Sequence, residues 1–449
     1  MIVLPQEDFL SGLSLSVGGL YDRPPLHVRV FRMAPDGLQK EREVRIERNS
    51  YDEESPVFVY WRPISNSSGA SFKVTVQRLD VQNRAVEYDL ADSEILPKLI
   101  YSNPRSWLHV PQSIGFSPVT QCNLNCTHCI SKFSRKSLSV LDDAIWEQIK
   151  EHISVGHITH FCSDYSGDLL NSDRKYGWLK RVVATGVKLN IDTHANNLTE
   201  ESTEILLASN LTTINFSVDS LLPEQYKTIR KGGDLPTVLR NIRHFVHEKN
   251  KRRPEIATMI SFAMMRSTMG SLFLAVDLAA EIGINWVQGN HLMVFTEDMA
   301  DESLLLDRTY YAQKHRELLD YAASKDVTVS LPEPFKELAP TKGHAPCIVP
   351  WVGAQILGNG DVMACCMPGT KVGNLHEQSL PEVWNGKRMQ AFRSRVNTDT
   401  PPGPCASCPM YRVPNNFSSY APGLFGSARE AFERRAASGL ITDPERQAS

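Results

Sequence analysis

The sequence predicts an α/β protein with a β-rich region before the α/β region and a cysteine-rich region after it. From about residue 112 to 331, runs with strand periodicity alternate with runs with helix periodicity. Residues 1–108 contain strand-like runs separated by turn residues, without a helical run. Most of the nine cysteines fall into two clusters, which is the most informative feature of the composition.

Residues 1–108 are predicted to form a small antiparallel β-domain that resembles a sandwich. Alternating runs at 26–31, 42–47, 57–61 and 72–77 are separated by turns rich in Pro, Asp, Asn, Ser and Gly. Such a domain could bind a substrate or a partner, or it could serve as a packing module or oligomer contact. The pattern predicts its class and leaves its task open.

The α/β region contains a regular series of strands and helices. Strands are predicted at 112–120, 158–162, 187–191, 213–217, 257–265, 286–294 and 327–331. Helices are predicted at 139–153, where Ser139 to Asp142 has the pattern of a capping box, and at 174–185, 200–208, 235–248, 272–282 and 304–323. Strict alternation of this kind implies parallel strands joined by right-handed crossovers.

Charge and composition exclude several classes of function. The net charge is −3 and no long basic block is present, which gives no support to a nucleic-acid partner. No stretch reaches 18 apolar residues and the N-terminus lacks a basic signal-peptide region, so we expect a cytoplasmic protein without a membrane segment. In that compartment thiols stay reduced, and clustered cysteines indicate metal or cluster binding.

The first cysteine cluster is Cys122, Cys126 and Cys129, spaced at four and three residues after the first predicted strand. A tetrahedral zinc site would need a fourth ligand nearby, and no suitable residue follows Cys129. His128 lies between two of the cysteines and is not expected to turn inward with them. Three thiolates suit a cubane iron–sulfur cluster with one iron left open for a further ligand.

This C-x3-C-x2-C pattern resembles the signature of the radical S-adenosylmethionine (radical SAM) superfamily. The resemblance implies a partial (β/α)6 TIM-like barrel at 109–335, with the site at the C-terminal ends of the strands. It also implies a [4Fe–4S] cluster on Cys122, Cys126 and Cys129 whose open iron binds SAM. Reductive cleavage of SAM would give a 5′-deoxyadenosyl radical that abstracts hydrogen from a substrate. A reducing partner such as flavodoxin or ferredoxin is expected, and His128 replaces the aromatic residue common in the family.

Four strand ends carry further likenesses to the family. Gly167 and Asp168 stand where Gly-Gly-Glu-Pro is usual and would meet the SAM ammonium, although a plain Gly-Asp turn is the alternative. Thr193 occupies the position of a common Thr-Asn-Gly motif. Ser217, in Ser-Val-Asp, is a candidate for contacts with the SAM ribose or carboxylate. Arg230, in Tyr-x-x-Ile-Arg, could pair with the SAM carboxylate through its planar guanidinium.

The second cysteine cluster, at 336–412, resembles the C-terminal extension called SPASM or, in its shorter form, twitch. The likeness consists of Cys347, Gly-x-Val-x-x-Cys365, Gly-Asn-Leu, a Trp-Asn helix and Cys405-x-x-Cys408. It implies one auxiliary [4Fe–4S] cluster ligated by Cys347, Cys365, Cys405 and Cys408. Cys366 competes with Cys365 for the second position, and a zinc site remains the alternative. The tail at 413–449 is predicted to contain a helix.

An auxiliary cluster with four protein ligands could accept an electron from a substrate radical. This favours a net oxidation, such as dehydrogenation of a sugar or cyclitol by a radical SAM oxidoreductase. The alternatives are a peptide-modifying enzyme that forms a crosslink or an epimer, and a non-catalytic, zinc-stabilised interaction protein. Cys162 could return a hydrogen atom in an epimerase, although a lone cysteine in a strand is more often a small buried hydrophobe. Residues 1–108 lack the helical run of the winged-helix element that many peptide-modifying relatives use. No catalytic residue is assigned beyond the cofactor ligands.

Overall fold

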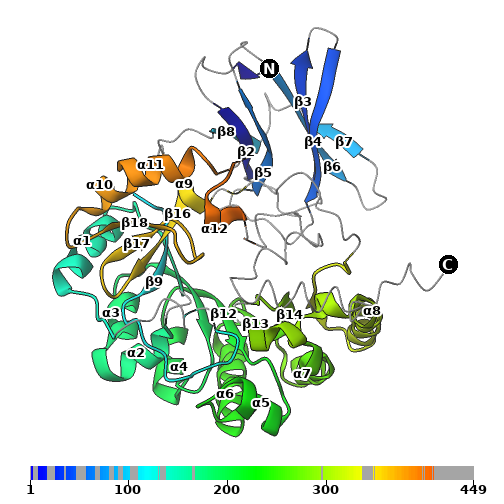
Figure 1. Cartoon of the computed structure of the whole chain (residues 1–449), viewed down its shortest axis with the longest axis vertical. Coiled ribbons are helices and arrows are strands. Elements are labelled where there is room, and N and C mark those ends of the chain that lie inside the picture. The colour runs from blue at the N-terminus through cyan, green and yellow to red at the C-terminus, as the bar shows by residue number, and fades with distance from the viewer. Residues whose placement is uncertain are drawn as a thin grey trace. The chain divides into compact units, whose positions relative to one another are not determined.

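The structure is a computed structural model of the 449-residue chain (Figure 1). It describes the backbone of the strands within residues 2–101, and it describes residues 110–129, 131, 138–163, 167–294, 297–335, 347, 349–396, 398, 400–406 and 408. The predicted tail at 413–449 lies outside the described residues. The chain divides into two compact units, which are described separately. One comprises Met1–Ser106, Gly343–Ile348 and Gln390–Pro402, and the other Trp107–Lys342, Val349–Met389 and Gly403–Ser449.

The N-terminal strands form two antiparallel sheets. The first has the order β1-β6-β3-β4, with β7 paired to β6, and the second has the order β5-β2-β8. Their bounds are β1 Ile2–Val3, β2 Phe9–Val17, β3 Leu26–Ala34, β4 Gly37–Ile46, β5 Val57–Ser65, β6 Ser71–Leu79, β7 Ala85–Tyr88 and β8 Ile95–Tyr101. The predicted antiparallel β class is confirmed, and the domain boundaries at 108, 335 and 412 stay predictions.

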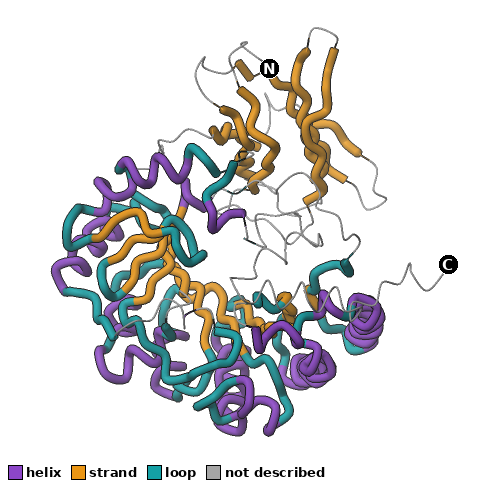
Figure 2. The backbone as a smooth tube through the Cα atoms, in the orientation of Figure 1, coloured by secondary structure: helices purple, strands orange, loops and turns teal. Residues whose placement is uncertain are grey.

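The second unit is built on a ten-stranded sheet in the order β15-β14-β13-β12-β11-β10-β9-β16-β17-β18. Strands β9 to β15 are parallel and form the predicted partial barrel. They span β9 Ser113–Ser117, β10 His160–Ser163, β11 Lys188–Thr193, β12 Leu211–Ser217, β13 Ala257–Met264, β14 Trp286–His291 and β15 Thr328–Ser330. Figure 2 shows the curved sheet of strands on the inside and the helices around its outer side.

The helices of the barrel lie between successive strands, as the alternating pattern predicts. They are α1 Asp143–Ser154, α2 Leu169–Tyr176, α3 Trp178–Val183, α4 Glu200–Leu207, α5 Pro223–Ile229, α6 Leu235–Arg252, α7 Met269–Ile282 and α8 Arg308–Ser324. Short α5 lies within the β12–β13 connection and was not predicted. None of the helices in the described part of the chain is long and apolar enough to span a membrane.

Alternate strand residues pack against the helices and form the core. Phe116 of β9 and Phe161 of β10 contact Trp146 of α1, with ring centroids 5.0 to 6.3 Å apart within this group. Trp178 of α3 joins the cluster, with its ring centroid 5.8 Å from that of Phe116. All four side chains are buried, and aromatic side chains of this size contribute much of a core's hydrophobic stabilisation. The intervening strand residues face the inner side of the barrel, where the polar ones gather.

Three predicted helices differ from the structure. Helix α1 starts at Asp143, so the capping box at Ser139 was wrong. Ser139 instead pairs with Thr120, whose N–H donates to the Ser139 carbonyl at 3.0 Å and whose hydroxyl lies 2.7 Å from the Ser139 hydroxyl. A tertiary contact therefore replaces the local one. The helix predicted at 174–185 is two helices, because Gly177 adopts a left-handed φ of 64° between α2 and α3.

The third difference concerns the long helix predicted at 304–323. Leu304–Leu306 form a single 3-10 turn, and α8 begins only at Arg308. The side chain of Asp307 accepts the N–H of Tyr310 at 3.2 Å, so it caps the new helix start. The apolar residues on both sides of Asp307 gave the sequence a continuous helical pattern, so the break at this cap was not predicted.

The C-terminal cysteine region continues the barrel sheet. Strand β16 (Gly353–Leu357) pairs in parallel with β9, and β17 (Asp361–Met363) and β18 (Lys371–Asn374) follow as antiparallel neighbours. Short helices α9 Val349–Val352, α10 Leu380–Trp384, α11 Lys387–Arg393 and α12 Gly403–Ala406 complete the region. The pairing of β16 with β9, which lies far away in the sequence, was not predicted.

Candidate active site and cysteine regions

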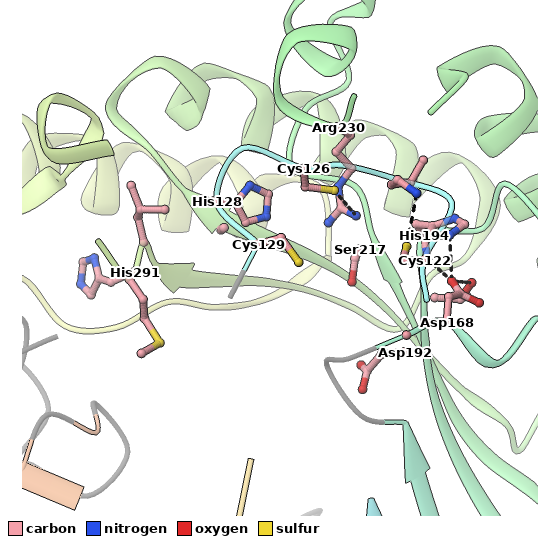
Figure 3. Close-up of a pocket in the computed structure, with 16 residues that line it drawn as sticks. Cys122, Cys126, His128, Cys129, Asp168, Asp192, His194, Ser217, Arg230 and His291 are labelled. Carbon is pink, nitrogen blue, oxygen red and sulfur yellow. Dashed lines mark hydrogen bonds and ion pairs between the residues drawn. The ribbon is translucent and has the colours of Figure 1, made fainter. Parts of the chain in front are cut away.

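The cysteine loop, residues 122–129, borders a cavity of about 360 Å³ at the C-terminal ends of the barrel strands. Cys122, Cys126 and Cys129 all line this cavity (Figure 3). The Sγ of Cys122 accepts the N–H of Leu124 at 3.4 Å, and the Sγ of Cys129 lies 2.8 Å from the Ser131 hydroxyl. The volume falls in the range of about 300–1,000 Å³ typical of small-molecule pockets.

The connection between α5 and α6 holds the cysteine loop in place. The N–H of Asn125 donates to the Lys231 carbonyl, and the N–H of Thr127 donates to the Ile229 carbonyl, both at 2.8 Å. Gly232 has a left-handed φ of 93°, and a Cβ there would lie 3.1 Å from the carbonyl oxygen of Asn123. The loop is therefore fixed by backbone contacts on a segment about 100 residues further along the chain.

Asp168 follows β10 and accepts four hydrogen bonds from neutral donors. Its Oδ1 accepts the N–H groups of Leu170 and Asn171, in the first turn of α2, at 2.9 and 3.3 Å. Its Oδ2 accepts the Thr193 hydroxyl at 2.8 Å and the N–H of His194 at 3.1 Å. These bonds connect the end of β10 to the end of β11.

Two neighbours complete this side of the site. The Nε2 of His194 lies 3.2 Å from Oδ2 of Asp168, and burial lowers the pKa of His194 more than the nearby carboxylate raises it. A Cβ at Gly167 would lie 2.5 Å from the Val119 carbonyl oxygen, so the close approach of this turn to the β9 end requires glycine. Asp168 and Thr193 thus bond to one another, and the predicted contact of Asp168 with the SAM ammonium stays a prediction.

Asp219 follows β12 and binds the side chains of Arg230 and His128. Its Oδ2 accepts the Nε of Arg230 at 2.7 Å, and Nη2 of Arg230 lies at the same distance. The Nε2 of His128 lies 3.1 Å from the same oxygen, and Oδ1 accepts the N–H of Ala263 at 2.7 Å. The Nη1 of Arg230 points to Sγ of Cys126 at 4.0 Å. Arg230 is thus paired with Asp219 as well as directed at the cysteine loop.

Ser217 and Asp192 form part of the cavity wall on the inner side of the barrel (Figure 3). Asp192 is open to the cavity yet surrounded by protein atoms. Its carboxylate accepts Asn215 Nδ2 at 2.7 Å, and its N–H donates to the Ser163 hydroxyl at 3.0 Å. Cys162, in β10, is half-buried, with Sγ 3.7 Å from the Ser113 hydroxyl. Whether Cys162 is only a small packing residue, as is more common, or also a hydrogen donor is not tested by these contacts.

The second cysteine region has a different local structure. Cys365 follows β17, and its Sγ accepts the N–H of Met367 at 3.4 Å, while Cys366 is exposed. Cys405 is buried in α12, and the N–H of Cys408 donates to its carbonyl at 3.2 Å. A Cβ at Gly369 would lie 3.5 Å from Pro404, so the loop after Cys365 approaches the segment that carries Cys405.

Cys347 belongs to the compact unit of the N-terminal strands, and Cys365, Cys405 and Cys408 belong to the other. The predicted set of four ligands therefore stays a prediction, as does the choice of Cys365 over Cys366. No group of three or more His, Cys, Asp or Glu side chains is placed to hold a single metal ion within the described ranges.

Comparisons with known proteins agree with this arrangement. Residues 116–261 match the radical SAM superfamily, and residues 347–409 match the SPASM iron–sulfur cluster-binding domain. The fold resembles SuiB of Streptococcus suis bound to S-adenosylmethionine, with 17% identity, a TM-score of 0.50 and coverage of 64% of this chain and 68% of that one. It also resembles anSMEcpe with bound AdoMet, with 14% identity, a TM-score of 0.51 and coverage of 75% and 99%. No curated protein sequence matches the chain.

The chain therefore carries a radical SAM domain, matched over residues 116–261, and a C-terminal SPASM domain, matched over residues 347–409. Its cofactors are a SAM-binding [4Fe–4S] cluster, an auxiliary [4Fe–4S] cluster and SAM. The residues present fit the first cluster, because three thiols from one loop line one cavity and soft thiolates are the usual ligands of iron–sulfur clusters. A guanidinium beside one of these thiols adds a positive charge that suits an anionic cluster.

Sequence reasoning missed three residues of the site. Asp219 lies in the Ser-Val-Asp motif from which only Ser217 was selected, and the acidic residue itself was the available signal. Asp192 directly precedes Thr193 at the end of a strand, where inward-facing polar residues are expected. His128 was considered only as a departure from the family pattern, although its pairing with Asp219 gives it a defined place.

Proposed function

We propose that this enzyme oxidises an alcohol group of a small polar metabolite, such as a sugar or a cyclitol. When bound, the cofactors supply a 5′-deoxyadenosyl radical that abstracts a hydrogen atom, and an acceptor for one electron. A flavodoxin or ferredoxin is the proposed source of electrons for SAM cleavage. The proposed ligands are Cys122, Cys126 and Cys129 for the SAM-binding cluster, and Cys347, Cys365, Cys405 and Cys408 for the auxiliary cluster.

The observation that carries the proposal is the carboxylate of Asp192 in the wall of the same cavity as the cysteine loop. Burial raises the pKa of Asp192, and the charge of nearby Asp168 raises it further, while the hydrogen bond from Asn215 opposes the change. A carboxylate with a raised pKa is a stronger base than an exposed one. It is therefore suited to take a proton from a substrate hydroxyl.

The chemistry of alcohol oxidation requires such a base. Loss of a hydrogen atom from a carbinol carbon leaves a carbon radical that still carries its hydroxyl group. Formation of the carbonyl then removes one proton and one electron. The Asp192 carboxylate takes the proton, and Asn215 holds its Oδ1 in position at 2.7 Å.

The test uses anaerobically reconstituted protein, dithionite and SAM with a panel of sugars and cyclitols deuterated at their carbinol carbons. We expect one of them to raise 5′-deoxyadenosine formation, to transfer deuterium into that product and to yield a ketone. Asp192→Asn should retain deuterium transfer but form the ketone roughly 100-fold more slowly, a loss typical of removing a general base. Stimulation by peptides alone, or unchanged ketone formation in the variant, would refute the proposal.

A further inference from the structure

Asp219 and Arg230 form a charged pair beside the cysteine loop, and His128 of that loop also contacts Asp219. Asp219 is 2% exposed and Arg230 is 7% exposed, so neither is a surface ion pair. Arg230 directs two nitrogens to Asp219 and the third, Nη1, to Sγ of Cys126. The carboxylate therefore determines which way the guanidinium faces.

Both members of the pair remain charged in the folded protein. Burial alone would raise the pKa of Asp219, but the charges of Arg230 and His128 hold that pKa well below its usual range. Arg230 keeps its charge because a guanidinium is not deprotonated in proteins. Charges act more strongly in a buried, low-dielectric setting than at a surface. A fixed positive group next to Cys126 will therefore affect any charge that develops there.

Backbone contacts hold this arrangement in place. Asp219 adopts a left-handed φ of 64°, and its Oδ1 is held by the N–H of Ala263 from β13. Arg230 ends α5, where its N–H donates to the Tyr226 carbonyl at 2.7 Å. The residues on either side of Arg230 accept hydrogen bonds from the cysteine loop. The distance between the guanidinium and Cys126 thus depends on short backbone connections together with one carboxylate.

We infer that Asp219 is a positioning residue that keeps the Arg230 guanidinium against Cys126 and thereby sets the reduction potential of the SAM-binding cluster. The reduced cluster carries one more negative charge than the oxidised cluster. The positive charge of Arg230 favours the reduced form, and the negative charge of Asp219 moderates this effect. The inference rests on the proposed ligation of that cluster by Cys126, and it does not depend on the identity of the substrate.

The test is a redox titration of the holoenzyme followed by electron paramagnetic resonance, with the signal that changes on SAM addition assigned to the SAM-binding cluster. At a potential where half of the wild-type cluster is reduced, Arg230→Gln should lower the ratio of reduced to oxidised cluster by about tenfold, equivalent to about 59 mV for one electron. Asp219→Asn should raise that ratio, because it removes the opposing charge while its amide oxygen still accepts a hydrogen bond from the guanidinium. Asparagine tolerates a left-handed φ, so this variant preserves the backbone.

Arg230→Lys distinguishes an effect of the positive charge from an effect of the guanidinium geometry. It also tests the inference if Asp219→Asn fails to fold. It keeps the positive charge and loses the planar fork, so its ratio should stay within about threefold of the wild type if charge sets the potential. The auxiliary cluster gives an internal control, since its potential should not change. A SAM-responsive signal whose potential is the same in all variants, or shifts equally in the Lys and Gln variants, would overturn the inference alone. A wild type without a SAM-responsive signal would overturn the ligand assignment as well.

Discussion

Asp168 and Asp219 are both buried, and both follow barrel strands that end at the candidate site, but their partners differ in charge. Asp168 accepts two backbone N–H groups of α2, one further backbone N–H and one hydroxyl, all of them neutral. Asp219 accepts one backbone N–H and otherwise binds the side chains of Arg230 and His128.

The comparison shows that burial of a carboxylate does not define its role. The donors around Asp168 belong to the backbone of α2 and to the end of β11, so Asp168 determines where two elements meet. The donors around Asp219 include a permanent cation directed at Cys126, so Asp219 determines where a charge lies. Substitutions at Asp168 and Asp219 should therefore lower the free energy of unfolding by different amounts. A different second change or replacement residue should recover the loss at each position.

The largest effect is expected from Asp219→Ala. It leaves the buried Arg230 guanidinium without its carboxylate, and breaking a buried ion pair in this way costs about 3–5 kcal/mol. The double variant Asp219→Ala with Arg230→Met should recover most of this loss, because it removes both charges. Urea unfolding under anaerobic conditions measures both. A double variant as unstable as the single one would show that charge is not the cause.

A smaller loss is expected from Asp168→Ala. The change removes the cap of α2 and leaves N–H groups of α2 and the N–H of His194 without an acceptor, at a cost of about 2–3 kcal/mol. Asp168→Asn keeps one carbonyl oxygen for these neutral donors and should lose about 1 kcal/mol. The same urea measurement applies. If asparagine were as damaging as alanine, the negative charge would matter at Asp168 too, and the contrast with Asp219 would fail.

The sequence was sufficient to predict that some of these residues belong to the site. Asp168, Thr193 and Arg230 could be selected because each follows a predicted strand or stands in a recognisable motif. The order of strands was predictable for the same reason, since periodicity is a local property. Ser139 shows the limit of local patterns, because its capping-box pattern was outweighed by a hydrogen bond to Thr120, 19 residues away.

The pairing of Asp219 with Arg230 could not be predicted. It depends on the left-handed φ of Asp219 and on the end of α5, a helix absent from the predicted series. The attachment of β16 to β9 is likewise a contact between segments more than 200 residues apart, and register between distant strands is not encoded in their periodicity. Motif residues were therefore found, and the contacts that give them different roles were not.

The smallest effect concerns pH on the Asp168 side of the site. Burial lowers the pKa of His194 below 6.5, so the imidazole beside Asp168 is mainly neutral near pH 7. As the pH falls below 6.5, the unfolded chain binds a proton that the folded chain does not. The free energy of unfolding should then decrease, by up to about 1.4 kcal/mol per pH unit.

His194→Asn isolates this contribution, because asparagine can keep an acceptor near the Nδ1 position that receives the N–H of Asn196. Between about pH 7 and pH 5.5 the wild type should lose roughly 1 kcal/mol more stability than the variant in anaerobic urea unfolding. His291, whose pKa burial lowers to about 3, is present in both proteins, so its contribution cancels. Equal pH dependence in the two proteins would mean that His194 takes up a proton in the folded state. Asp168 would then face a cation as Asp219 does, and the distinction between the two carboxylates would hold only at neutral pH.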